Sequence, residues 1–266
     1  MALLPGAEPF LSDGGPTGML LSHGFTGTPQ SMRPWAEHLV AAGFTVSVPR
    51  LPGHGTRWQD LNATRWTDWY GEIERAFDAL AARCERVFAG GLSMGGALAL
   101  RLAEDRAADV AGLVLVNPAI GSRRRDVNHL LPVLHRFVPS LKGLGSDIAK
   151  PGVRELAYDR TPLRALHSQT QLWKLIVADL AKVTAPVLLY RSRVDHVVDP
   201  LSGRLLRDGA SSTEVTEVIL EDSYHVATLD HDAPLIFDGS VEFLRAHTTP
   251  QGDSPAPHGD RAGSAG

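Results

Sequence analysis

The feature that most constrains the fold is a serine placed between an apolar run and a helix-like segment. Ser93 lies in the pattern Gly-Leu-Ser-Met-Gly at 91–95, after the run Arg-Val-Phe-Ala-Gly and before Gly-Ala-Leu-Ala-Leu-Arg. The pattern alone is weak evidence, because a chain with 26 glycines can contain it by chance. Its context predicts a strand, a tight turn and a helix, which together form a nucleophile elbow. The alternative is an ordinary serine cap in a strand-to-helix turn.

Apolar runs and amphipathic segments alternate on both sides of this serine. We expect strands at residues 18–22, 44–48, 86–90, 112–116, 186–190 and 215–220, and helices at 31–42, 66–84, 93–104, 172–182, 201–209 and 234–247. The run 112–116 is apolar throughout, which is typical of a strand covered on both faces. Repeated strand–helix–strand units predict a mostly parallel sheet with helices on both faces.

The alternation is interrupted once, after Pro118. Arginine, proline and glycine are scattered through residues 119–165 among short helical pieces, and an apolar stretch occupies 129–138. We interpret 119–165 as a cap inserted into one core of residues 1–118 and 166–247. A disordered loop is the alternative, because loops of this length are either functional or disordered. The tail at 248–266 is rich in Gly, Pro, Ser and Asp, and we predict that it is disordered.

Composition and the absence of certain sequence patterns argue against several classes of protein. The net charge of −4 argues against a nucleic-acid partner, which needs a basic surface. A single cysteine, Cys84, excludes an intrachain disulfide and favours a reducing compartment. The chain shows no signal-peptide pattern, no apolar run of membrane-spanning length, no metal-ligand cluster and no dinucleotide fingerprint. We therefore predict a cytoplasmic protein without metal or cofactor, and we also expect a monomer.

The acid and the base should follow late strands, because on parallel sheets of this kind they come after the serine along the chain. Asp195 follows the strand at 186–190 and is the predicted acid; Asp199 is the competitor, but it begins the next helix and can cap it. His225 follows the strand at 215–220 and is the predicted base. His196 is adjacent to the acid, so its ring should point elsewhere. His231 lies near a helix start, and we expect it at the surface.

The loop His-Gly-Phe-Thr-Gly at 23–27 follows the first strand of the predicted sheet. Such a loop supplies one main-chain donor to an oxyanion hole, and the residue after the nucleophile supplies the other. These donors are the N–H groups of Phe25 and Met94. His23 precedes the nucleophile, and we interpret it as an anchor of the loop. The serine hydroxyl becomes a competent nucleophile once the imidazole of the base takes its proton.

Several short motifs occur in one order along the chain: HGFTGTP (23–29), PRLPGHG (49–55), GLSMGG (91–96), GSD (145–147), RELAY (154–158) with TP (161–162), DHVV (195–198), SSTE (211–214) and SYHVATLD (223–230). Together they resemble the bacterial monoacylglycerol lipases and the related small thermostable carboxylesterases of Bacillus-type bacteria, over residues 5–246. The chain departs from them at Asp199, where the relatives tend to have proline, and in the cap segment 123–137.

The resemblance implies the α/β-hydrolase fold with a small cap and a triad of Ser93, Asp195 and His225. It also implies that Glu155, in the cap motif RELAY, binds the glycerol hydroxyls of a substrate. A surface salt bridge is the alternative for this glutamate. No cofactor or metal is implied.

The activity implied by the resemblance is hydrolysis of monoacylglycerols to a fatty acid and glycerol through an acyl-enzyme. The alternatives are a carboxylesterase of broad short-acyl specificity, a thioesterase or carbon–carbon hydrolase on the same scaffold, and a non-catalytic receptor, against which the intact triad speaks. The cap's apolar stretch would line the acyl route, make transient contact with a membrane surface, or only pack the cap onto the core. Its apolar residues are Leu130, Leu131, Val133, Leu134, Phe137 and Val138.

Overall fold

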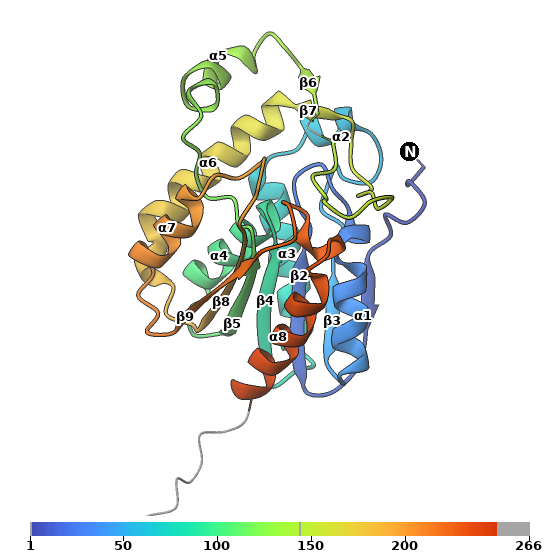
Figure 1. The fold of residues 1–266 in the computed structure, drawn as a ribbon, viewed down its shortest axis with the longest axis vertical. Helices are drawn as coiled ribbons and strands as arrows, with labels where there is room; N and C mark the ends of the chain where they lie inside the picture. The colour runs from blue at the N-terminus through green and yellow to red at the C-terminus, as the bar shows by residue number, and fades with distance from the viewer. Residues whose placement is uncertain (1, 144, 249–266) are drawn as a thin grey trace, which may run out of the picture.

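A single large sheet organises the chain in the computed structural model, which describes residues 2–143 and 145–248 (Figure 1). Its seven strands have the order β1-β3-β2-β4-β5-β8-β9. They are β1 (Phe10–Ser12), β2 (Thr17–Ser22), β3 (Thr45–Val48), β4 (Arg86–Leu92), β5 (Val110–Val116), β8 (Val187–Ser192) and β9 (Val215–Leu220). The edge strand β1 pairs antiparallel with β3, and the other neighbours are parallel. Apart from residue 248, the tail predicted to be disordered lies outside the described residues.

The inner strands are apolar throughout because side chains alternate between two packed layers. In β5, Leu113 and Leu115 enter one core cluster, whereas Val114 and Val116 enter the other. The first cluster packs α3 (Trp66–Ala81), α4 (Met94–Asp105), α6 (Leu163–Asp179) and α7 (Leu201–Gly209) against the sheet. The second packs α1 (Arg33–Ala41) and α8 (Ala233–Ala246) against the opposite face. The predicted mostly parallel sheet with helices on both faces is therefore confirmed.

Some core elements differ from the sequence-based prediction. The helix expected at 172–182 begins earlier, at Leu163, so its first turn belongs to the segment assigned to the cap. The strand β1 was not predicted, because it has three residues, lies at the sheet edge and leaves Leu11 exposed. The strand β1 carries no continuous apolar run, and such a run is the signal that located the other strands.

The cap contains little regular structure. A π-helical turn (Asp126–Leu130) leads into α5 (Leu131–Leu134), and β6 (Ser140–Lys142) pairs antiparallel with β7 (Arg160–Pro162). These elements lie at one end of the molecule, where α5 contacts α6 and β7 contacts the short helix α2 (Trp58–Asn62) (Figure 1). The boundaries between the core and the cap at 119–165 remain a prediction from the sequence. None of the helices in the described part of the chain is both long and apolar enough to cross a membrane.

Candidate active site

Ser93 occupies the turn between β4 and α4, with φ of 56° and its N–H bound to the carbonyl oxygen of Val116 at 3.0 Å. A positive φ is costly for a residue with a side chain and marks a strained, functional turn. A Cβ atom at Gly91 or Gly95 would lie 2.5 or 2.0 Å from the carbonyl oxygen of Ser22 on β2. The flanking glycines are thus required because the backbone of the neighbouring strand passes against the turn.

The predicted acid and base are in direct contact. His225 Nδ1 lies 2.8 Å from Asp195 Oδ2, and both side chains are less than a tenth exposed. The other oxygen, Asp195 Oδ1, accepts the N–H groups of Val197 and Val198 at 2.8 Å each. Since the Asp195 carboxylate accepts a hydrogen bond from Nδ1–H, the tautomer leaves Nε2 as the acceptor nitrogen. Ser93 and His225 line one cavity.

Burial and charge oppose each other in this pair. Burial disfavours the imidazolium, but the charge and hydrogen bond of Asp195, followed by the charges of Glu155 and Asp147, raise the pKa of His225 above 6.5. Burial likewise favours a neutral carboxyl group at Asp195, but His225 and the two main-chain donors hold its pKa below 3.8. The pair is therefore arranged to carry a positive charge on the imidazole while the carboxylate stays ionised.

The competing acid and histidines lie elsewhere. Asp199 Oδ1 accepts the N–H of Leu201 at the start of α7, and its Oδ2 accepts the N–H of Arg123. Its expected capping role is confirmed. The ring of His196 is 60% exposed and pairs with Asp147, and His231 is exposed, as expected for both.

His23 anchors the loop after β2, as the sequence suggested. Its Nδ1 donates to the carbonyl oxygen of Gly24 at 3.0 Å, and its Nε2 accepts the N–H of Leu51 at 3.2 Å. Burial lowers the pKa of His23 to about 4, which keeps the ring neutral as this pairing requires. In the anchored loop Phe25 lines the cavity beside Ser93. Met94 is the first residue of α4, where the helix leaves N–H groups without an internal partner.

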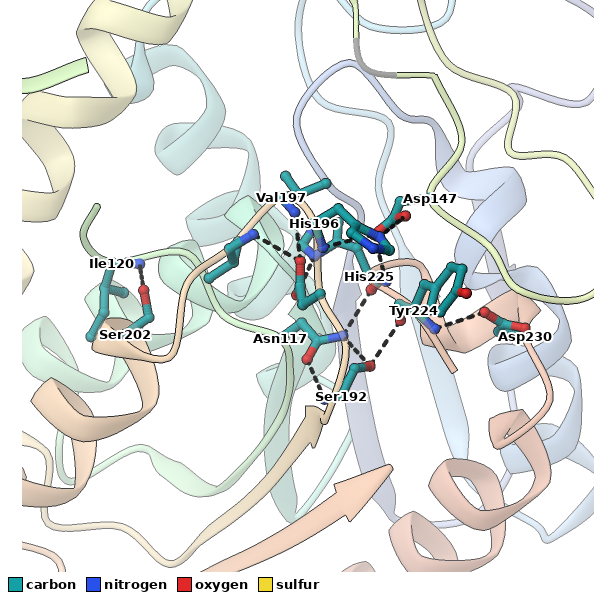
Figure 2. Close-up of polar contacts among 12 residues, drawn as sticks. Asn117, Ile120, Asp147, Ser192, His196, Val197, Ser202, Tyr224, His225 and Asp230 are labelled. Carbon is teal, nitrogen blue, oxygen red and sulfur yellow. Dashed lines mark hydrogen bonds and ion pairs between the residues drawn. The ribbon is translucent and has the colours of Figure 1, made fainter. Parts of the chain in front are cut away.

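Asn117 is a site residue that sequence reasoning missed. It follows β5 with φ of 45°, and its Nδ2 donates to Ser192 Oγ and to the carbonyl oxygen of His225, each at 2.9 Å (Figure 2). Its Oδ1 accepts the N–H of Ser192 at 2.8 Å. Asn117 thereby ties the ends of β5 and β8 to the loop that carries the base. An Asn directly after an apolar strand was the available signal, because Asn tolerates positive φ.

Glu155 faces inward and takes no part in a surface salt bridge. It is partly buried and lines the cavity with Ser93 and His225, and its Oε1 lies 2.5 Å from the position that a Cβ of Gly27 would occupy. Burial raises the pKa of Glu155, against the opposing effects of His225 and the Ser31 hydroxyl. A partly buried carboxyl group in this cavity needs hydrogen-bond donors, which the hydroxyl groups of a substrate can provide.

The cavity has a volume of about 310 Å³ and an apolar side formed by the cap. Leu131 and Leu134 line it, whereas Leu130 lines it and is also 54% exposed. Val133 and Phe137 point away from it, with exposures of 55% and 80%. The apolar stretch is therefore divided between cavity and solvent. Within 2–143 and 145–248, no group of three or more His, Cys, Asp or Glu side chains is placed to hold a metal ion.

A parallel sheet, a serine at a strand-to-helix elbow and an Asp–His pair after the last two strands define a serine hydrolase of the α/β-hydrolase fold. The model of the Hydrolase_4 family, described as serine aminopeptidase S33, matches residues 17–232, and the chain belongs to this family. The resemblance inferred from the short motifs is confirmed by this match and by individual relatives.

The chain is 44% identical to the thermostable monoacylglycerol lipase of Bacillus sp. (strain H-257), over 92% of this chain and 97% of the relative. It is 25% identical to a carboxylesterase of Bacillus subtilis (strain 168), over 89% and 96%. A structure reported for the metagenome-derived lipolytic enzymes LipS and LipT superposes with a TM-score of 0.90 at 43% identity, covering 92% of this chain and all of the other.

Proposed function

We propose that this protein hydrolyses monoacylglycerols to a fatty acid and glycerol. The observation that carries the proposal is that Ser93, His225 and the inward-facing Glu155 line one cavity. The 44% identity to a monoacylglycerol lipase over nearly the whole of both chains supports the same substrate class. The lower identity to a carboxylesterase makes broad short-acyl esterase activity the less favoured alternative.

In the proposed mechanism, Ser93 Oγ attacks the ester carbonyl carbon and His225 Nε2 takes the hydroxyl proton. The N–H groups of Phe25 and Met94 stabilise the oxyanion, and Asp195 stabilises the imidazolium. The tetrahedral intermediate collapses, the carbon–oxygen bond to glycerol breaks, and His225 returns the proton to the leaving oxygen. Water, deprotonated by His225, then cleaves the acyl-enzyme and frees Ser93.

Glu155 supplies the proposed selectivity for glycerol. A carboxylate accepts hydrogen bonds from two neighbouring hydroxyl groups, which a glycerol monoester has and a simple alkyl ester lacks. The leaving group would occupy the Glu155 side of the cavity, and the acyl chain would lie along Leu131 and Leu134. Leaving a buried hydrogen-bonding group unpaired costs about 1–3 kcal/mol, so an ester without these hydroxyl groups should be disfavoured by about 10-fold or more.

The test compares kcat/KM for a monoacylglycerol and for an alkyl ester of the same acyl chain in wild type and in Glu155→Gln. We expect the ratio to favour the monoacylglycerol in wild type and to fall by about 10-fold in the variant. The same substitution at the exposed Glu242, on α8, serves as the matched control. An unchanged ratio in Glu155→Gln would refute the glycerol-recognition role.

The outer cap surface is proposed to make transient contact with a lipid surface. Val133 and Phe137 are exposed, and Leu130 and Leu141 are both exposed and part of the cavity lining. Residues 119–165 contain nine Lys and Arg against four Asp and Glu, although the whole chain is acidic. Exposed apolar side chains with basic neighbours favour the surface of an anionic bilayer.

Cosedimentation with phosphatidylcholine vesicles, with and without phosphatidylglycerol, tests this contact. We expect binding that increases with the anionic lipid and decreases in Phe137→Ser. Leu235→Ser on α8 is the control, because Leu235 is 48% exposed and lies outside the cap. Equal vesicle binding by Phe137→Ser and wild type would rule out the cap as the contact surface.

The cellular location and the oligomeric state remain predictions made from the sequence. The free Cys84 fits a reducing compartment, and we propose a cytoplasmic location, which cell fractionation would test. We also propose a monomer, and light scattering coupled to gel filtration would reveal a larger assembly.

A further inference from the structure

Asp147, in the cap, has its side chain against two histidine-bearing loops of the core. Its Oδ2 accepts the N–H of His196 at 3.1 Å and the N–H of His225 at 3.2 Å. Its Oδ1 lies 2.7 Å from His196 Nδ1, and its carbonyl oxygen accepts the N–H of Val226. The side chain is only 14% exposed. Figure 2 shows Asp147 beside His196 and His225. One cap carboxylate thus joins the loop after β8 to the loop after β9.

These contacts fix the backbone of the proposed base from the side of the cap. The N–H of His225 is held by Asp147, and its carbonyl oxygen is held by Asn117 from the core (Figure 2). Asp147 binds the main chain of His225, whereas the imidazole pairs with Asp195, so Asp147 would act through the position of the histidine. A small displacement of a catalytic group, of the order of 1 Å, can lower the rate by about 100-fold.

The same cap segment also reaches the glycerol side of the cavity. Ser146 Oγ, next to Asp147, accepts the N–H of Glu155 at 3.0 Å. Beyond Asp147, the N–H groups of Ala149 and Lys150 bind the carboxylate of Asp230, which also accepts the N–H of Tyr224. The segment is therefore docked along the loop that carries His225, and it contacts the backbone of both His225 and Glu155.

We propose that Asp147 is a positioning residue for His225, because it holds the main-chain N–H of the base from the side of the cap. This inference rests on the proposed role of His225 as the base. It assigns to the cap a part in catalysis that is separate from substrate binding, because the contact is made with the base and not with an ester.

Two substitutions at Asp147 separate the effect of its hydrogen bonds to the main chain from the effect of its charge. Asp147→Asn keeps an oxygen for the two N–H groups and removes the charge, whereas Asp147→Ala removes both. We expect Asp147→Ala to lower kcat by about 10- to 100-fold with KM changed less than about 2-fold. Asp147→Asn should keep kcat within about 3-fold and move the acid limb of the kcat/KM profile to lower pH, because one carboxylate facing His225 is lost while Asp195 and Glu155 remain.

Asp230→Asn is the matched control, because Asp230 docks the same segment without contacting His225. It should lower the thermal midpoint while leaving most of kcat. His196→Ala removes the ring that pairs with Asp147 Oδ1 and tests whether this pairing contributes to kcat. We expect kcat to stay within about 3-fold of wild type. An equal loss of kcat in Asp230→Asn and Asp147→Ala would overturn the proposal, as would a wild-type kcat in Asp147→Ala. Labelling of wild-type Ser93 by a fluorophosphonate distinguishes failure of this proposal from failure of the proposed function. If wild type does not label, the proposed function itself has failed.

Discussion

Replacement of Asn117 should destabilise the fold and the site together. Asn117→Ala removes three buried hydrogen bonds and leaves the N–H of Ser192 and the carbonyl oxygen of His225 without their partner. Each such group costs about 1–3 kcal/mol, so the expected loss is about 2–6 kcal/mol. That is a large part of the about 5–15 kcal/mol by which folded domains are stable.

The backbone at this position gives the prediction a second, sharper form. The φ of 45° strains alanine by about 1–2 kcal/mol but does not strain glycine. Glycine in turn gives the unfolded chain more freedom, which costs about 0.5–1 kcal/mol. Asn117→Gly should therefore be more stable than Asn117→Ala by about 0.5–1 kcal/mol, opposite to the usual order of these residues.

Equilibrium unfolding in urea measures both differences, and kcat/KM on a soluble ester is read in parallel. We expect lower stability and lower kcat in both variants, because the carbonyl group of His225 is released. A loss of less than about 1 kcal/mol in Asn117→Ala would show that these hydrogen bonds do not hold the loop. An alanine variant more stable than the glycine variant would refute the strain argument.

Three further perturbations test separate parts of the structure. The acid limb of the kcat/KM profile should have an apparent pKa above 6.5, because the raised pKa of His225 leaves more of the base protonated as pH falls; a value below 6.5 would contradict the pairing with Asp195. Gly95→Ala should abolish fluorophosphonate labelling, since its Cβ would meet the carbonyl oxygen of Ser22 at 2.0 Å, whereas Gly71→Ala on α3 meets nothing within 4 Å and should raise stability by about 0.5–1 kcal/mol. Arg101→Met should cost about 3–5 kcal/mol in urea unfolding because the mostly buried guanidinium pairs with Glu104, Asp105 and Asp179; a change below about 1 kcal/mol would show that the cluster contributes little.

The positions of the inner strands along the chain and the pairing of Asp195 with His225 were predictable from the sequence. Apolar runs located the inner strands, and the fixed chain order of nucleophile, acid and base reduced the choice to the loops after the last two strands. The capping role of Asp199 could also be expected, because it involves a residue two positions away.

The supporting contacts could not be predicted in the same way. Asn117 contacts residues 75 and 108 positions further along, and Asp147 contacts a residue 78 positions away, so nothing in their local sequence reveals the partner. For a related reason, the sequence does not show which residues of the cap's apolar stretch face the cavity and which face solvent. Leu131 and Val133 are equally apolar, and only the direction of α5 places one in the cavity and the other in solvent.

In the proposed mechanism, Ser93 forms a covalent acyl-enzyme with the help of His225. Intact-mass analysis after exposure to a fluorophosphonate tests it most directly, using wild type, Ser93→Ala and the exposed-serine control Ser211→Ala. We expect one adduct in wild type and in Ser211→Ala, mapped by peptide sequencing to Ser93, and none in Ser93→Ala. Folded wild-type protein without an adduct, or an adduct that persists in Ser93→Ala, would contradict it.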